Sequence, residues 1–194
     1  MTGPALLVLR LVIGGLVAGH GAQKLFGFSG GPGPEGTARF MRMLGLRPGE
    51  RWAFLAGASE LLGGSLTALG LLNPLGPILV LGPMATATLT AHRGKPIWVT
   101  AGGAELPITN MAVAVALILA GPGSVSLDAL FGARVPWWFS FLALVGVGAG
   151  VKLSDDAAQA AHRRKTEPVS ARATESRSET RNGQPAEATV EATA

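Results

Sequence analysis

Several ionisable and amide side chains lie within or beside otherwise apolar stretches of this sequence, where they could bind a ligand or a proton. Six of them have types and spacing suited to one polar site: His20, Gln23, Lys24, Glu60, Glu105 and Asn110. His20 is three residues from Gln23 and four from Lys24, so a helix would place the three on one face. Imidazole, amine and carboxylate groups together suit a proton relay, a quinone headgroup or a small polar ligand.

Glu60 is the strongest candidate because it lies nine residues beyond Arg51, inside an apolar stretch. At ~1.5 Å of rise per residue, a helix would carry it ~13 Å from that arginine, close to the middle of a membrane. Ala56, Glu60 and Gly64 would share one stripe among small neighbours. We therefore expect Glu60 to face another helix rather than lipid.

Two interpretations of these polar residues remain open. In the first, they line a pocket that opens to the cytoplasm. In the second, Glu60 is protonated or paired with His20 or Asn110 and only fixes the register between helices. Capping at the membrane boundary better explains three of the polar side chains: Gln23, Lys24 and His92.

The elements that must position these residues are apolar segments of nearly membrane-spanning length. The 194-residue chain is 48% hydrophobic and 14% charged, and its charges gather between long apolar stretches. A span needs about 20 mostly apolar residues, and five segments approach this: 4–26, 52–72, 75–91, 105–121 and 135–151. The sequence therefore predicts an all-α membrane protein with about five transmembrane helices. Gly15 and Gly19 are expected to give the first helix a close-packing face.

The distribution of basic residues predicts the orientation. The loop after the first span contains four arginines, the loop after the third contains Arg93 and Lys95, and the tail begins with Lys152. Only Arg10 and Arg134 lie on the opposite side. The positive-inside rule then places the N-terminus outside and the C-terminus in the cytoplasm, in a multi-pass protein of the plasma membrane. Topology thus explains the basic residues better than nucleic-acid binding does.

The chain contains no cysteine. It cannot form a disulfide, bind a metal through thiolate or carry a redox dithiol, so any thiol chemistry must take place on a partner. Residues 154–194 lack aromatic residues and are rich in Ala, Thr, Ser, Glu and Arg. This composition predicts a disordered cytoplasmic tail.

Four stretches of the sequence form a recognisable series: RLVIGGLVAGHGAQKLFGF at 10–28, ELLGG at 60–64, GGAELP at 102–107 and GPGSVSLD at 121–128. Together they resemble the DoxX family of small membrane proteins, usually described with four spans. The resemblance implies a four-helix transmembrane bundle over 1–132, to which this chain adds a fifth transmembrane helix (133–153) and the tail (154–194). The polar positions that match the family are His20, Gln23, Lys24, Glu60, Glu105 and Asp128. No catalytic role comes with them.

The resemblance also implies a function. Some family members look like partners of membrane oxidoreductase complexes linked to thiol chemistry and oxidative-stress defence, and related proteins are subunits of thiosulfate:quinone oxidoreductases. We therefore expect an accessory subunit that contacts quinone near His20, Glu60 and Glu105, with soluble oxidoreductase partners on its cytoplasmic side. Because the sequence has no cofactor motif, a complete enzyme is not expected from this chain alone.

Two other classes of function remain open. A small transporter or channel could use Glu60 as its proton- or ligand-binding residue, and a homo-oligomer would compensate for the small number of spans. A membrane scaffold would instead recruit soluble partners through its C-terminal tail.

Overall fold

A computed structural model describes residues 2–166 of the chain, which form seven α-helices and two short 3₁₀ helices. In chain order these are α1 (Thr2–Phe26), η1 (Phe28–Gly30), α2 (Gly33–Met43), α3 (Gly49–Leu69), α4 (Leu75–Thr90), η2 (Val99–Ala101), α5 (Glu105–Ala120), α6 (Leu127–Phe131) and α7 (Trp137–Thr166). Residues 2–166 contain no β-strand, so the predicted all-α class is confirmed for this part of the chain. The five predicted spans coincide with α1, α3, α4, α5 and α7.

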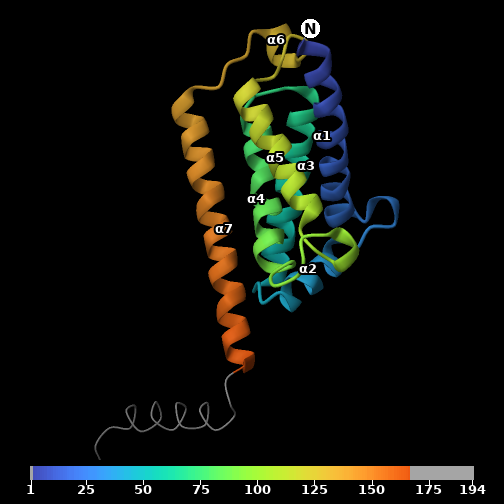
Figure 1. Ribbon diagram of the computed structural model, residues 1–194, viewed down its shortest axis with the longest axis vertical. Helices are drawn as coiled ribbons and strands as arrows, with labels where there is room; N and C mark the ends of the chain where they lie inside the picture. Colours follow the sequence, from blue (N-terminus) through green and yellow to red (C-terminus); the bar gives the residue numbers. More distant parts are fainter. Residues whose placement is uncertain (1, 167–194) are drawn as a thin grey trace, which may run out of the picture.

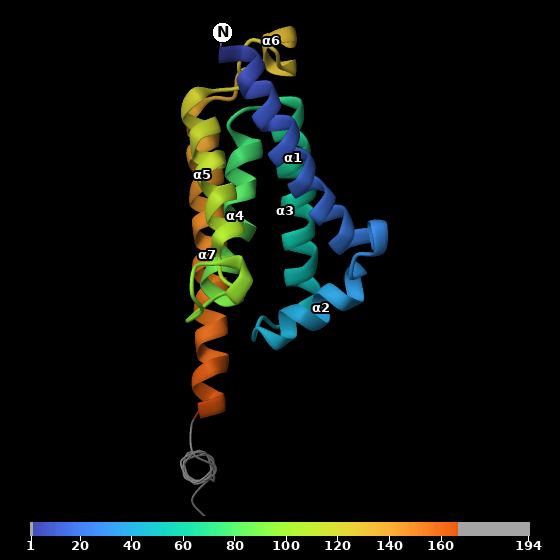
Figure 2. The same ribbon diagram turned by 45° about the vertical axis from the view of Figure 1, so that its right-hand side comes forward.

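Four helices, α1, α3, α4 and α5, lie side by side with alternating directions, and α7 packs along α4 at the edge of the group (Figure 1). The N-terminus and α6 lie at one end of the molecule, which we call the α6 end. The helix α2 crosses the opposite end, beneath α3, and we call this the α2 end (Figure 2). The last turns of α7 extend past the α2 end.

Glycines bring α1 and α3 into close contact. A Cβ atom placed on Gly14 would lie 2.6 Å from the carbonyl oxygen of Gly64, and one on Gly21 would lie 2.7 Å from that of Gly57. Both distances are too short for any side chain. The expected close-packing face on Gly15 and Gly19 is wrong, since neither has a neighbour within 4 Å of a Cβ position. The glycines of α1 that contact α3, Gly14 and Gly21, are instead seven residues apart, about two helical turns.

The helix α2 occupies a stretch that the sequence predicts as a loop. Its start is favoured by a proline in the first turn and by Glu35, whose charge complements the helix dipole. Its buried residues Ala38 and Met41 pack with Leu46 and Ala53 into a small core at the α2 end. This packing holds α2 against the beginning of α3.

The helix α7 is longer than predicted. The sequence predicts a span that ends at 153 and a disordered tail from 154, but α7 continues to Thr166, so the tail prediction is wrong for residues 154–166. Ser154 is fully buried, with its Oγ 3.1 Å from Oγ1 of Thr86. Lys152 pairs with Asp156 one turn later, and alanines with high helix propensity follow. Residues 167–194 lie outside the described part of the chain.

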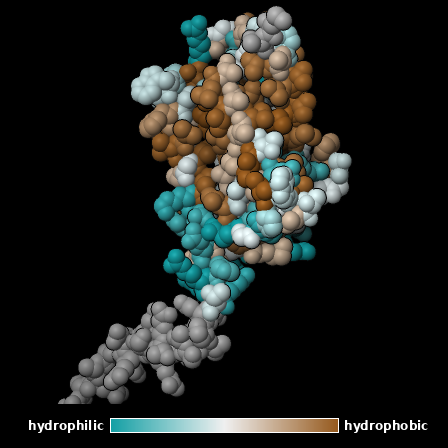
Figure 3. All heavy atoms as spheres, in the orientation of Figure 1, coloured by the Kyte–Doolittle hydropathy of each residue, from teal (hydrophilic) through white to brown (hydrophobic). Residues whose placement is uncertain are grey.

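The surface is apolar over most of its length. In Figure 3 hydrophobic side chains cover the middle and the α6 side of the visible face, and hydrophilic ones gather towards the α2 end. Among residues 2–166, two helices, α1 and α7, are long and apolar enough to cross a membrane. The helices α4 and α5 are apolar but have 16 residues each, short of the ~20 that a perpendicular crossing needs. Crossing by α3, α4 and α5 therefore stays a prediction.

Candidate functional site

Lys24 and Glu60 form an ion pair between α1 and α3, in which the Lys24 ammonium donates to Oε2 of Glu60. Lys24 lies two residues before the end of α1, and Glu60 lies near the middle of α3. The Glu60 side chain is 3% exposed and that of Lys24 is 26% exposed. A buried carboxylate is costly unless it is paired, and Lys24 is the partner that Glu60 has in this structure.

The pairing of Glu60 differs from the sequence-based interpretation, which gave it His20 or Asn110. The face of α1 that meets α3 contains Gly14, Val17 and Gly21, all buried. Lys24 continues that series at helical spacing, whereas His20 lies one position away from it and is exposed. The expectation that Glu60 faces a neighbouring helix is confirmed.

The ion pair lies in the wall of a cavity of about 380 Å³ between α2, α3, α4 and α7. Most of the remaining wall is apolar, and its larger side chains are Phe40, Met41, Leu46, Trp52, Leu55, Val147 and Val151. We call this the apolar cavity. Gly146 and Gly150 of α7 also line it, and neither has an atom within 4 Å of a Cβ position.

The hydroxyl groups that line the apolar cavity are already engaged in bonds between or within helices. Ser59 donates to the carbonyl of Leu79 at 2.9 Å, and Thr90 donates to that of Thr86 at 2.7 Å. The Thr86 hydroxyl is hydrogen-bonded to that of Ser154 at 3.1 Å. The ion pair is therefore the main polar group that the cavity offers to a ligand. Such a lining suits a largely apolar molecule with one polar end.

A second cavity, of about 490 Å³, lies between the end of α1, α2 and the first turns of α3. Lys24 lines it together with Arg42 and Glu50, which form an ion pair of their own. Because Lys24 lines both cavities, it is accessible from each. We call this the charged cavity.

His20 and Gln23 form a separate group on the outer face of α1. The Nδ1 atom of His20 lies 3.1 Å from Oε1 of Gln23. Neither residue lines the apolar cavity or the charged cavity. The structure therefore does not bring them together with Glu60.

Glu105, Asn110 and His92 also lie apart from the ion pair. The Glu105 carboxylate accepts the backbone N–H of Val99 at 2.8 Å and so caps the loop before α5. Asn110 donates to the sulfur of Met84 at 3.5 Å, between α5 and α4. His92 lies 2.7 Å from the carbonyl of Gly102. Of the six predicted site residues, the structure brings two separate pairs into contact, Lys24 with Glu60 and His20 with Gln23.

A second buried charge cluster lies at the α6 end. Arg10 is buried in α1 and donates to the carbonyl of Val125, and its Nη1 atom has no hydrogen-bond partner within residues 2–166. Asp128 of α6 is also buried and accepts the backbone N–H groups of Leu72 and Asn73, each at 2.8 Å. These contacts tie α1 and α6 to the turn between α3 and α4. The family resemblance indicates Asp128, but nothing in the sequence distinguishes Arg10 from a charge that only sets the topology.

The sequence-based interpretation missed the contribution of α2 and α7 to the apolar cavity. A signal for α2 was present, since Thr37, Ala38 and Met41 are spaced as one helix face while Glu35 and Arg39 lie off it. For α7 no such signal exists, because the residues that line the cavity lie within a continuous apolar stretch, 141–151, and are not set apart from their neighbours.

Part of this chain matches a known protein family. A family model described as DoxX matches residues 5–93, which contain most of α1, all of α2, α3 and α4, and both members of the Lys24–Glu60 pair. The helices α5 and α7 lie outside the match. No curated protein and no solved structure matches the chain significantly. Residues 5–93 of this chain are therefore a DoxX domain.

Proposed function

We propose that this membrane protein binds a quinone in the apolar cavity and is an accessory subunit of a membrane oxidoreductase system linked to thiol or sulfur redox chemistry or to oxidative-stress defence. The observation that carries the proposal is the Lys24–Glu60 pair in the wall of an otherwise apolar cavity. A quinone has an apolar ring and tail and two carbonyl acceptors. An ammonium group has three N–H donors, of which the pair uses one.

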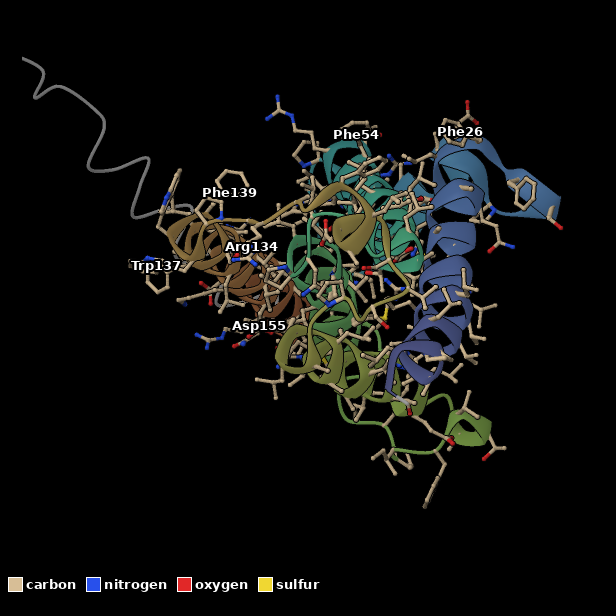
Figure 4. The ribbon with its side chains drawn as sticks, turned by 90° about the horizontal axis from the view of Figure 1, so that it is seen from above. Phe26, Phe54, Arg134, Trp137, Phe139 and Asp155 are labelled. Carbon is tan, nitrogen blue, oxygen red and sulfur yellow. The ribbon has the colours of Figure 1, made fainter. Side chains whose placement is uncertain are left out.

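The surroundings of the cavity favour a ligand from the lipid phase. The helices α3, α4 and α7 form its walls together with α2, and α7 presents exposed aromatic and aliphatic side chains to its surroundings. Trp137 and Phe139 point away from the other helices (Figure 4). The helix α7 packs chiefly on α4, and its Gly146 and Gly150 line the cavity, so a hydrophobic molecule could enter between α7 and α3.

We place the α2 end on the cytoplasmic side of the plasma membrane. The basic residues of the predicted inner loops lie there: Arg39, Arg42, Arg47, Arg51, Arg93, Lys95 and Lys152. The apolar cavity and the ion pair lie towards the same end, so a soluble oxidoreductase docked at the α2 end would approach the quinone. The family resemblance supports a partner of this kind.

Quinone binding can be measured through Trp52, which lines the apolar cavity. Quinones quench indole fluorescence at short range, and the other tryptophans, Trp98, Trp137 and Trp138, are exposed and do not line this cavity. We expect a short-tailed quinone to quench the purified protein in lipid nanodiscs with saturation. The saturable part of the quenching should vanish in Trp52→Phe.

A cavity-filling variant separates this site from binding elsewhere. Ala87 lines the apolar cavity, and Ala112 is exposed on α5 and does not. Ala87→Phe should abolish quinone binding measured by equilibrium dialysis, and Ala112→Phe should leave it unchanged. Equal binding by both variants would rule out the apolar cavity as the quinone site.

A further inference from the structure

The charged cavity opens at the level where apolar and charged side chains meet. On its apolar side are Leu25, Phe26 and Phe54. Phe26 is 72% exposed and Phe54 is 62% exposed, and both lie on the same side of the molecule (Figure 4). Phenylalanine has no polar group, so these exposed rings suit the hydrocarbon, and the charged residues beside them suit the headgroup region.

The charges of this cavity are mixed, and most of them are already paired. Arg42 pairs with Glu50, and Lys24 pairs with Glu60. Two charged residues that line the cavity have no ion pair or side-chain hydrogen bond within residues 2–166, namely Arg39 and Glu35. They lie four residues apart on α2 and are exposed. The cavity therefore offers one free cation and one free carboxylate about one helical turn apart.

From this arrangement we infer that the charged cavity binds the headgroup of a zwitterionic aminophospholipid of the phosphatidylethanolamine class. The Arg39 guanidinium binds the phosphate, for which its planar N–H donors are suited. The Glu35 carboxylate accepts hydrogen bonds from the ammonium group. The acyl chains lie along Phe26 and Phe54, on the hydrocarbon side. The two headgroup contacts, Arg39 and Glu35, do not line the apolar cavity, so the inference does not depend on the proposed quinone.

The mixed charge distinguishes this headgroup from the commoner alternatives. A purely anionic headgroup such as phosphatidylglycerol would find Arg39 but would leave the Glu35 carboxylate without a cation. A choline headgroup has a positive charge but no N–H to donate to that carboxylate. An aminophospholipid satisfies both residues.

Native mass spectrometry of the full chain tests the inference. The protein is released from nanodiscs that contain equal amounts of phosphatidylethanolamine, phosphatidylglycerol and phosphatidylcholine, and the bound lipid is identified. We expect one phosphatidylethanolamine to be retained in preference to the other two. Preference for phosphatidylglycerol, or no preference, would overturn the inference.

Two variants test the contacts that Arg39 and Glu35 make with the headgroup. Arg39→Gln should lower lipid retention about tenfold, because a hydrogen bond to a charged group is lost. Glu35→Gln should keep retention but shift the preference towards phosphatidylglycerol. Arg47→Gln is the matched control, since Arg47 is exposed and lines neither cavity, and it should behave as the wild type. All three proteins should show the size-exclusion profile of the parent.

The same experiment distinguishes a lipid headgroup from a soluble phosphate compound as the occupant of the charged cavity. Millimolar inorganic phosphate or phosphoethanolamine should leave the bound lipid in place, because neither has acyl chains to contact Phe26 and Phe54. Displacement by either would mean that a soluble phosphate compound occupies the cavity, and so would overturn a lipid site. Equal lipid retention by Arg39→Gln, Glu35→Gln and the wild type would also overturn it.

Discussion

Glu60 is a carboxylate buried between helices, and Lys24 is the residue that offsets the cost of burying it. Removal of one partner from a buried ion pair costs about 3–5 kcal/mol, whereas replacement of both by apolar groups of similar volume is often neutral. We therefore expect Lys24→Met to lower the thermal unfolding temperature in detergent. The double variant Lys24→Met/Glu60→Leu should recover most of that loss.

The comparison of the single and double variants distinguishes an ion pair between Lys24 and Glu60 from a protonated Glu60 that has no need of Lys24. If Glu60 were already protonated in the wild-type protein, it would not need the Lys24 ammonium. Lys24→Met would then unfold at nearly the wild-type temperature. Arg51→Met is the matched control, because Arg51 is an exposed cation with no ion pair within residues 2–166. It should be close to neutral.

At the residue scale, the sequence predicted that Glu60 faces inward but not which residue it meets. The spacing of Ala56, Glu60 and Gly64 defines a face of one helix. The partner depends on how α1 is rotated against α3, and that rotation is set by the contacts of Gly14 and Gly21 with α3. Spacing within one helix contains no information on the rotation of another, so Lys24 could not be selected over His20.

At the element scale, the contact between α1 and α3 depends on residues without side chains. A glycine inside an exposed helix costs roughly 0.5–1 kcal/mol relative to alanine, so Gly→Ala is ordinarily stabilising. At Gly21 a Cβ atom would lie 2.7 Å from the carbonyl oxygen of Gly57. Gly21→Ala should therefore push α1 from α3 and lower the unfolding temperature. Circular dichroism on heating measures this directly.

The same substitution elsewhere on α1 provides the control. A Cβ atom at Gly19 meets nothing within 4 Å, so Gly19→Ala should be neutral or slightly stabilising. Because Gly19 and Gly21 are two residues apart on one helix, the comparison isolates the contact from helix propensity. Equal unfolding temperatures for the two variants would contradict the close contact between α1 and α3.

The helices α1, α3, α4, α5 and α7 were predictable, because long apolar segments between charged loops mark them. The helix α2 and the last turns of α7 were not predicted, since both are polar and their helicity depends on packing. The helix α2 is held by the small core around Leu46, and α7 is held by the burial of Ser154 on α4. Composition alone favours a loop and a tail at these positions.

At the scale of the whole molecule, the two ends differ in chemistry. The α6 end contains the buried Arg10 and Asp128. Arg10 joins α1 to the loop before α6, and Asp128 joins α6 to the turn between α3 and α4. The α2 end contains both cavities and most of the basic residues. This asymmetry would let water and soluble partners reach the ion pair from one side only. The orientation of the chain in the membrane therefore determines from which compartment a soluble partner can reach the ion pair.

The absence of cysteine from the chain makes the orientation directly testable. Leu130 of α6 and Arg164 of α7 are exposed and lie at opposite ends of the molecule. A membrane-impermeant maleimide should label Leu130→Cys in intact cells, because the positive-inside rule places the α6 end outside. It should label Arg164→Cys only after the cells are permeabilised, and the wild-type chain should not be labelled at all. The reverse pattern would invert the topology and place the apolar cavity near the outer surface, and labelling of both variants in intact cells would rule out an odd number of crossings.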